Sequence, residues 1–123
     1  MKVKSYKELN VWKKGIEIVN RIYEITERFP HKENYGLSSQ MQRAAVSIPS
    51  NIAEGFVRGH TAEYRQYLRV ALGSCAELDT QLVIVGEREY TSQTEILSIQ
   101  KELEYESRMI TNLIKSLMQN AKP

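Results

Sequence analysis

Arginine and tyrosine residues alternate in the middle of the chain. Arg58, Arg65 and Arg69 occur there, with Tyr64 and Tyr67 between them. Guanidinium groups bind phosphate through paired N–H donors, and aromatic rings can stack on bases. Arg65 and Arg69 are four residues apart, so a helix would place both on one face, with Tyr64 out of phase and pointing inward. Taken alone, the pattern favours a solvated helix face beside a core, and the alternative interpretation is a nucleic-acid-binding site.

Further basic residues lie near the N-terminus. Lys13 and Lys14, with Lys7 and Arg21, would extend the arginine site only if the first helix neighbours the arginine-bearing helix. The first 70 residues carry 12 Lys and Arg against 7 Asp and Glu, and the rest carry 5 against 8. The net charge of +2 is therefore the sum of a basic segment, residues 1–70, and an acidic segment, residues 71–123.

A group of polar residues recurs at steps of four, four and three, and so shares one helix face. These residues are Arg43, Ser47, Asn51 and Glu54. Pro49 lies in the same stretch, and its missing amide leaves the carbonyl of Ala45 without a helical partner. The favoured interpretation is structural: the polar side chains satisfy one another and the freed backbone, or contact another subunit. The alternative is a ligand site.

Signals of enzyme chemistry are poor. His31 and His60 have no partner at metal-ligand spacing, and Cys75 lies on an apolar stripe, where a thiol behaves as a small hydrophobe. The Glu-x-x-His motifs of di-iron bundles are missing, and so is a Gly-rich phosphate loop. We therefore expect no catalytic residue, no metal site and no cofactor. A small-molecule enzyme would need an open pocket around the Arg43–Glu54 face.

Length and composition favour one globular domain over residues 1–123. The 123 residues are 41% hydrophobic and 26% charged, which argues against wholesale disorder. The single cysteine excludes an intramolecular disulfide. No apolar run approaches the roughly 20 residues of a membrane span, and the N-terminus has no apolar signal region. We expect a cytoplasmic protein without membrane contact.

Four segments show apolar residues at the helical period, over about 9–29, 37–56, 60–89 and 92–120. Short connections make successive helices antiparallel, which predicts an all-α, up-down-up-down four-helix bundle. The first segment has two apolar stripes, one through Trp12 and Val19 and one through Ile18 and Ile22. Pro49 either separates two short helices or kinks one. The apolar stripe keeps its phase across the proline, which favours a second helix kinked at Pro49.

Local signals mark the helix ends and some contacts. Gly59 is a plausible C-cap, Thr61 a plausible N-cap, and Ser92-Gln93-Thr94-Glu95 fits a capping box. Gly73 and Gly86 interrupt the third helix, where a small residue would allow close helix approach. The last helix has a heptad-like apolar seam with Glu106 at one position.

The centre of the chain resembles a family signature. Residues 35–58 read YGLSSQMQRAAVSIPSNIAEGFVR, which resembles the signature of the four-helix-bundle family named after the 23S rRNA intervening-sequence protein. Upstream, YKELNVWKKGIEIVNRIYEIT is similar to that family's opening helix. Downstream, EYRQYLRVALGSCAELDTQL resembles its third helix. The likeness covers almost the whole chain and is weakest over residues 91–123.

The resemblance implies a ring-shaped homopentamer without a defined biochemical role. It also implies similarity to the accessory variability protein of diversity-generating retroelements, a basic pentamer that binds nucleic acid and the reverse transcriptase. The signature residues carried over, which resemble family architecture more than a catalytic set, are Arg43, Ser47, Pro49, Asn51, Glu54 and Gly55. One departure is that Gln42-Arg43 stands where the family usually has two basic residues, which removes one positive charge.

Two hypotheses follow. The first is a non-enzymatic, homo-oligomeric scaffold that binds RNA or DNA through a basic surface; its candidate residues are Lys13, Lys14, Arg58, Arg65 and Arg69. The second is a protein-interaction module in which basic faces meet acidic faces of a neighbouring subunit or protein partner. The fourth segment supplies a candidate acidic face through Glu102, Glu104 and Glu106.

Overall fold

Four long α-helices make up most of the chain. The computed structural model describes residues 3–120, in which the helices are α1 (Asn10–Thr26), α2 (Leu37–Arg58), α3 (Thr61–Glu87) and α4 (Gln93–Asn120). Two short 3₁₀ helices, η1 (Tyr6–Glu8) and η2 (His31–Glu33), precede α1 and α2. No strand occurs in this described part. The predicted all-α four-helix fold is confirmed.

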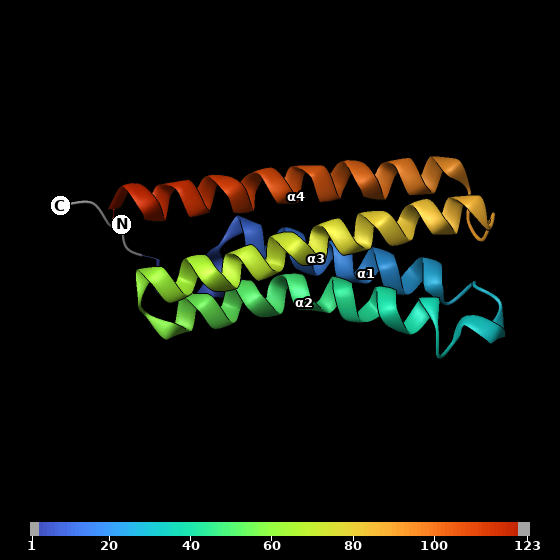
Figure 1. Cartoon of the computed structure of the whole chain (residues 1–123), viewed down its shortest axis with the longest axis horizontal. Helices are drawn as coiled ribbons and strands as arrows, with labels where there is room; N and C mark the ends of the chain where they lie inside the picture. Colours follow the sequence, from blue (N-terminus) through green and yellow to red (C-terminus); the bar gives the residue numbers. More distant parts are fainter. Residues whose placement is uncertain (1–2, 121–123) are drawn as a thin grey trace.

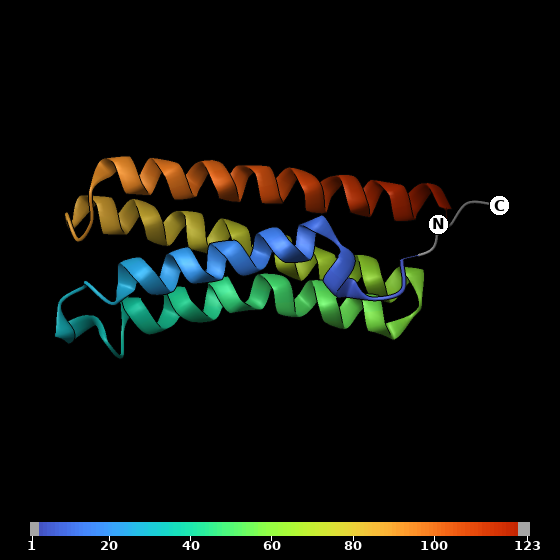
Figure 2. The ribbon, with the colours of Figure 1, turned by 180° about the vertical axis from the view of Figure 1, so that it is seen from behind.

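The helices lie side by side, with the chain running in opposite directions along successive helices (Figures 1 and 2). α2 packs against α1 and α3, and α4 packs against the same two helices. Within residues 3–120, no backbone contact joins α1 to α3 or α2 to α4. The four helices therefore occupy the corners of a square in chain order, and each has two neighbours.

The core is built from one apolar stripe of each helix. In α1 the buried stripe is the one through Ile18, Ile22 and Ile25. The stripe through Trp12 and Val19 is only partly buried and packs at the edge of the core. The remaining fully buried large side chains are Met41, Ile48, Ile52, Leu68, Leu78, Leu82, Ile96, Ile99 and Ile110.

α1 is shorter than the sequence pattern predicts. The helix ends at Thr26, and Phe29 lies beyond it, although Phe29 is still buried. The Thr26 hydroxyl donates to the carbonyl oxygen of Ile22 at 2.8 Å. The Phe29 ring then packs on Tyr90, with ring centroids 5.2 Å apart. Phe29 is therefore buried although it lies outside the helix. Pro30, which follows it, disfavours helical backbone at Phe29.

Pro49 lies inside one continuous helix. α2 runs unbroken from Leu37 to Arg58, so the alternative of two short helices is wrong, while a kink at Pro49 stays a prediction. The proline is buried against α1. A Cβ atom added to Gly15 would lie 3.2 Å from Pro49 Cβ and 3.3 Å from Cδ. Gly15 therefore lets the backbone of α1 approach the proline ring closely.

The helix-end predictions have mixed outcomes. Gly59 caps α2 with φ of +78°, the left-handed conformation that glycine adopts without steric cost. The N-cap of α3 is His60, which makes no side-chain capping bond, so the Thr61 prediction is wrong by one residue. At α4, the Ser92 hydroxyl accepts from the Glu95 N–H at 3.2 Å, which forms one half of the predicted capping box.

The carboxylate of Glu95 has other partners. It accepts from the Thr91 hydroxyl at 2.8 Å and from the Arg28 guanidinium at 2.9 Å. The pKa of Glu95 is lowered, first by the hydrogen bond from Arg28 and then by that from Thr91. The Glu95 side chain therefore joins the start of α4 to the segment after α1.

Gly55 allows a close approach of α2 and α3. A Cβ atom there would lie 2.8 Å from Tyr67 Cβ and 3.0 Å from Tyr64 Cδ1. Nothing lies within 4 Å of a Cβ placed on Gly73, so the expected close approach at Gly73 is wrong. At Gly86 a Cβ would meet Ile96 Cδ1 of α4 at 3.2 Å, as the small-residue prediction required.

The two glycines Gly55 and Gly73 form a matched pair for mutation. Alanine in a helix interior gains about 1 kcal/mol over glycine, so Gly73→Ala should raise the free energy of unfolding. Gly55→Ala has the same gain, but it forces α2 away from α3 and costs about 1–3 kcal/mol of overpacking. We expect Gly55→Ala to be the less stable variant by about that amount in urea unfolding. Equal stability of the two would contradict a tight α2–α3 contact.

Candidate nucleic-acid interface

Arg58 is the last residue of α2, and its charge is largely compensated. Its guanidinium lies 3.4 Å from the Glu54 carboxylate and 3.8 Å from that of Glu63, and 5.3 Å from the centre of the Tyr67 ring. The pKa of Arg58 is raised, first by Tyr67 and then by the hydrogen bond to Glu54. Sequence reasoning missed these partners, although the four-residue spacing of Glu54 and Arg58 is the usual signal of a helical ion pair.

Arg65 and Arg69 form the open part of the arginine site. Arg65 is partly exposed and Arg69 is exposed, one turn later on α3. Neither makes an ion pair with the residues that the structure describes. These two guanidinium groups are therefore available to an outside anion, whereas that of Arg58 is held.

The two tyrosines of the site have structural contacts. Tyr64 is partly buried and points inward as expected, packing edge-on against Phe56 with centroids 6.1 Å apart. Burial raises the pKa of Tyr64 to about 12. Tyr67 supports Arg58 with its ring and lies against Gly55 with its Cβ. Both rings therefore help to fix α2 against α3.

The N-terminal lysines do not extend the arginine site within one chain. Lys13 and Lys14 lie on α1, which is diagonal to α3, so the condition that the two helices be neighbours is not met. Lys14 Nζ lies 3.5 Å from Glu17 and 3.7 Å from Glu102, and it faces the Tyr105 ring. Lys13 is exposed and makes no ion pair within the described chain. The predicted basic residues therefore form two separate groups.

The polar face of α2 binds mainly to itself and to α3. Asn51 Nδ2 donates to the Ser47 carbonyl at 2.8 Å and to its hydroxyl at 2.9 Å. The hydroxyl of Ser74, on α3, donates to that of Ser47 at 2.9 Å. The exposed Arg43 donates to Ser39 at 3.4 Å. These bonds agree with the part of the structural interpretation in which the polar side chains satisfy one another, but none of them reaches the Ala45 carbonyl.

The acidic residues of α4 are already used inside the chain. Glu102 pairs with Lys14 and with Arg21. Glu104 pairs with Arg108 at 3.0 Å on the same helix, and Glu106 is fully buried. A neighbouring subunit would therefore find little free acidic surface on α4.

The described residues offer few other sites. They contain no group of three His, Cys, Asp or Glu side chains that could hold a metal ion. Cys75 is buried, and burial raises its thiol pKa to about 11. Within residues 3–120, no helix has both the length and the apolar character needed to cross a membrane.

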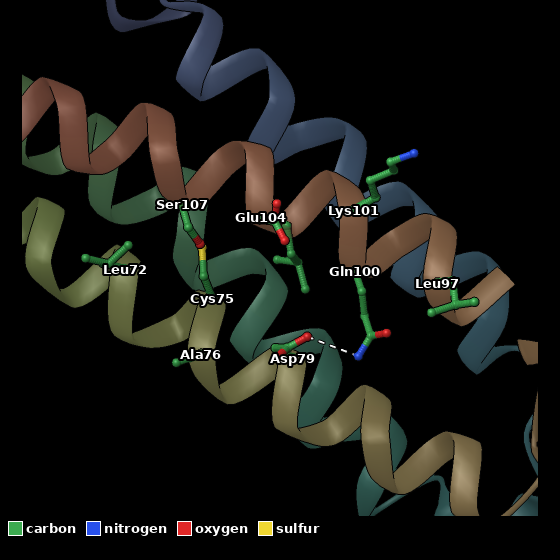
Figure 3. Close-up of a pocket in the computed structure, with 10 residues that line it drawn as sticks. Leu72, Cys75, Ala76, Asp79, Leu97, Gln100, Lys101, Glu104 and Ser107 are labelled. Atoms are coloured by element: carbon green, nitrogen blue, oxygen red, sulfur yellow. Dashed lines mark hydrogen bonds between the residues drawn. The ribbon is translucent and has the colours of Figure 1, made fainter. Parts of the chain in front are cut away.

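Two hollows lie along the seam between α3 and α4, and no residue of α2 lines either of them. The larger has a volume of about 730 Å³, and Figure 3 shows Leu72, Cys75 and Ala76 on one wall with Leu97, Gln100 and Ser107 on the other. Gln100 donates to Asp79 across it at 3.1 Å. The Arg43–Glu54 face therefore does not line either hollow.

Comparison with known proteins identifies a family and solved structures with a similar fold. The family model described as 23S rRNA-intervening sequence protein matches residues 7–112. A solved structure of a protein of unknown function from the S23 ribosomal protein family of Bacteroides thetaiotaomicron is similar, with a TM-score of 0.79 and 24% identity. The match covers 85% of this chain and 98% of that chain, and it shows a shared fold. No curated protein matches the sequence.

Ser47 is the residue on which the polar cluster depends. Ser47→Ala removes the hydroxyl that accepts from both Asn51 and Ser74, so we expect the free energy of unfolding to fall by about 1–3 kcal/mol. Ser50→Ala, at an exposed site on the same helix, is the matched control and should change stability by less than about 0.5 kcal/mol. Thermal or urea unfolding measures both. A neutral Ser47→Ala would argue that the face serves a ligand instead.

Proposed function

The chain belongs to the family of 23S rRNA-intervening sequence proteins, and on this premise we propose that it is a non-enzymatic helical scaffold that binds nucleic acid, primarily RNA. Binding would be mostly to phosphate, because the available side chains, Arg65, Arg69 and Lys13, are cationic. The family takes its name from inserts in ribosomal RNA, which makes RNA the first ligand to test.

The open arginine pair carries this proposal. Arg65 and Arg69 follow one another by one turn on α3, and no carboxylate of the described chain neutralises them. Arginine binds phosphate through two parallel N–H donors, so a pair on one helix face suits successive phosphates of a strand. Tyr67 and Gly55 hold α3 closely against α2, which places the pair on a rigid support.

Assembly would strengthen this weak site. One chain has a net charge of only +2, and in a single chain Lys13 lies on the helix diagonal to the arginines. In the homopentamer that the family resemblance implies, both groups would recur around one axis. Clustered charge of one sign raises the local potential and the rate of association with a polyanion. We propose that the oligomer, and not the single chain, is the binding form.

The alternative is a protein-interaction module without nucleic-acid binding. In its favour, large apolar side chains are exposed on the outer surface, among them Val57 at 69% and Leu97 at 57%. Exposed apolar residues that gather in patches commonly mark protein contact sites. The version of this alternative in which a basic face meets an acidic face of a neighbouring subunit has less support. The acidic side chains of α4 already have partners in the chain or are buried.

Replacing the arginine pair should weaken RNA binding. We expect Arg65→Gln with Arg69→Gln to lower affinity for a structured RNA in fluorescence anisotropy at low salt. The slope of log affinity against log salt should fall by roughly 0.7–0.9 for each phosphate that the variant no longer neutralises. Arg108→Gln is the control, because Arg108 is exposed but paired with Glu104 on α4. If the double variant and the control bind as wild type does, the arginine pair is not the site.

Sedimentation tests assembly and binding together. We expect the protein alone to sediment as an oligomer of about five chains, and the boundary to move faster when RNA is added. An oligomer that RNA does not shift at micromolar protein would favour the protein-interaction alternative. A monomer that binds RNA equally well would refute the role given to assembly.

A further inference from the structure

A carboxyl group lies in the core of the bundle without a partner. Glu106 of α4 has an exposed fraction of 0%, and neither of its side-chain oxygens makes a hydrogen bond with the residues that the structure describes. Its Oε2 atom lies 3.2 Å from the position that a Cβ would take on Gly15 of α1. The same Gly15 position touches Pro49 of α2. The carboxyl group therefore sits where α1 and α4 come together beside the proline ring of α2.

Few charged groups face this carboxyl. From α1, Lys14 and Glu17 act on it at a distance, while Lys14 itself pairs with Glu17 and Glu102. From α3 the titratable neighbour is Cys75. From α2 the neighbour is Pro49, which has neither charge nor N–H. No cation within the described chain thus offsets a negative charge at Glu106 by direct pairing.

Burial therefore favours the neutral acid. Burial raises the pKa of Glu106 to about 8, against 4.5 for an exposed glutamate, while Lys14 lowers it and Glu17 raises it. A raised acid pKa means that the closed bundle holds the proton more tightly than an opened one. The closed state is then favoured most below about pH 4.5, and this preference is lost progressively up to about pH 8.

The helix that carries Glu106 is also the one with the looser packing. Both hollows described above lie along the seam of α4 with α3. By contrast, α2 and α3 are locked at Gly55, where a single added carbon would collide with Tyr67. In both views α4 lies along one edge of the bundle (Figures 1 and 2). If the buried Glu106 carboxyl became negatively charged, movement of α4 would expose it to water and so reduce the cost of that charge.

We propose that Glu106 makes the docking of α4 depend on a proton: the bundle is closed when the carboxyl is neutral, and ionisation loosens α4 and opens the α3–α4 seam. The proton is lost from the Glu106 carboxyl to solvent, and no bond other than O–H breaks. Cys75 reports the opening, because it is the single cysteine, is almost fully buried, and lies in that seam beside Ser107 (Figure 3).

The test measures alkylation of Cys75 by N-ethylmaleimide from pH 5 to pH 9.5. The rate for the full-length wild type is divided by that of Glu106→Gln at the same pH, which cancels the ionisation of the thiol. We expect this ratio to rise by up to about tenfold per pH unit below pH 8 and to level off above it, as one proton requires. Glu104→Gln, at an exposed site on the same helix, should behave as wild type.

Hydrogen exchange read by peptide shows which helix opens. Faster exchange in α4 than in α2 above pH 8, absent from Glu106→Gln, supports the proposal. A flat alkylation ratio overturns it, and so does exchange that accelerates equally in all four helices, because the whole bundle would then unfold. If Glu106→Gln does not fold, the wild-type rate divided by that of glutathione gives the same profile and the same decision.

Discussion

Close helix contacts at glycine residues set the geometry of this bundle. Each helix can bury its apolar stripe only if its two neighbours approach closely, and Gly55 and Gly15 permit this at two seams. Gly55 brings α2 against Tyr64 and Tyr67 of α3. Gly15 brings α1 against Pro49 and leaves the space that the Glu106 carboxyl occupies. The arginine site and the buried acid both follow from these contacts.

Charge that is unbalanced along the sequence is partly balanced in space. The basic first part and the acidic last part meet at the seam of α1 and α4, where Arg21 pairs with Glu102 and Arg28 with Glu95. The Arg28–Glu95 pair is exposed, and exposed pairs contribute about 0–1 kcal/mol each, whereas the Arg21–Glu102 pair is partly buried. Other basic side chains of the described residues make no ion pair and remain available to an external polyanion, Arg65 and Arg69 among them.

Periodicity predicted the elements because it is local. Four helices, the inward direction of Tyr64, the cap at Gly59 and the seam position of Glu106 all follow from spacing within one segment. Periodicity could not show which apolar stripe of α1 faces the core, because the stripe through Trp12 and the stripe through Ile18 both follow the helical period. Nor could it pair Lys14 with Glu102, because that contact depends on which helices are neighbours. Of the partners of Arg58, only Glu54 could have been predicted from the sequence, because it lies four residues before Arg58.

The two proposed properties use different parts of the molecule. Arg65 and Arg69 lie on α3, which is held against α2 where Tyr67 of α3 packs against Gly55 of α2. Glu106 acts on α4, which makes no backbone contact with α2 within the described chain, although the Glu106 side chain lies beside Pro49. Loosening α4 would therefore leave the arginine pair in place and change the apolar seam of α3 and α4 instead. A proton lost at Glu106 would accordingly act on contacts made along that seam before it acted on phosphate binding.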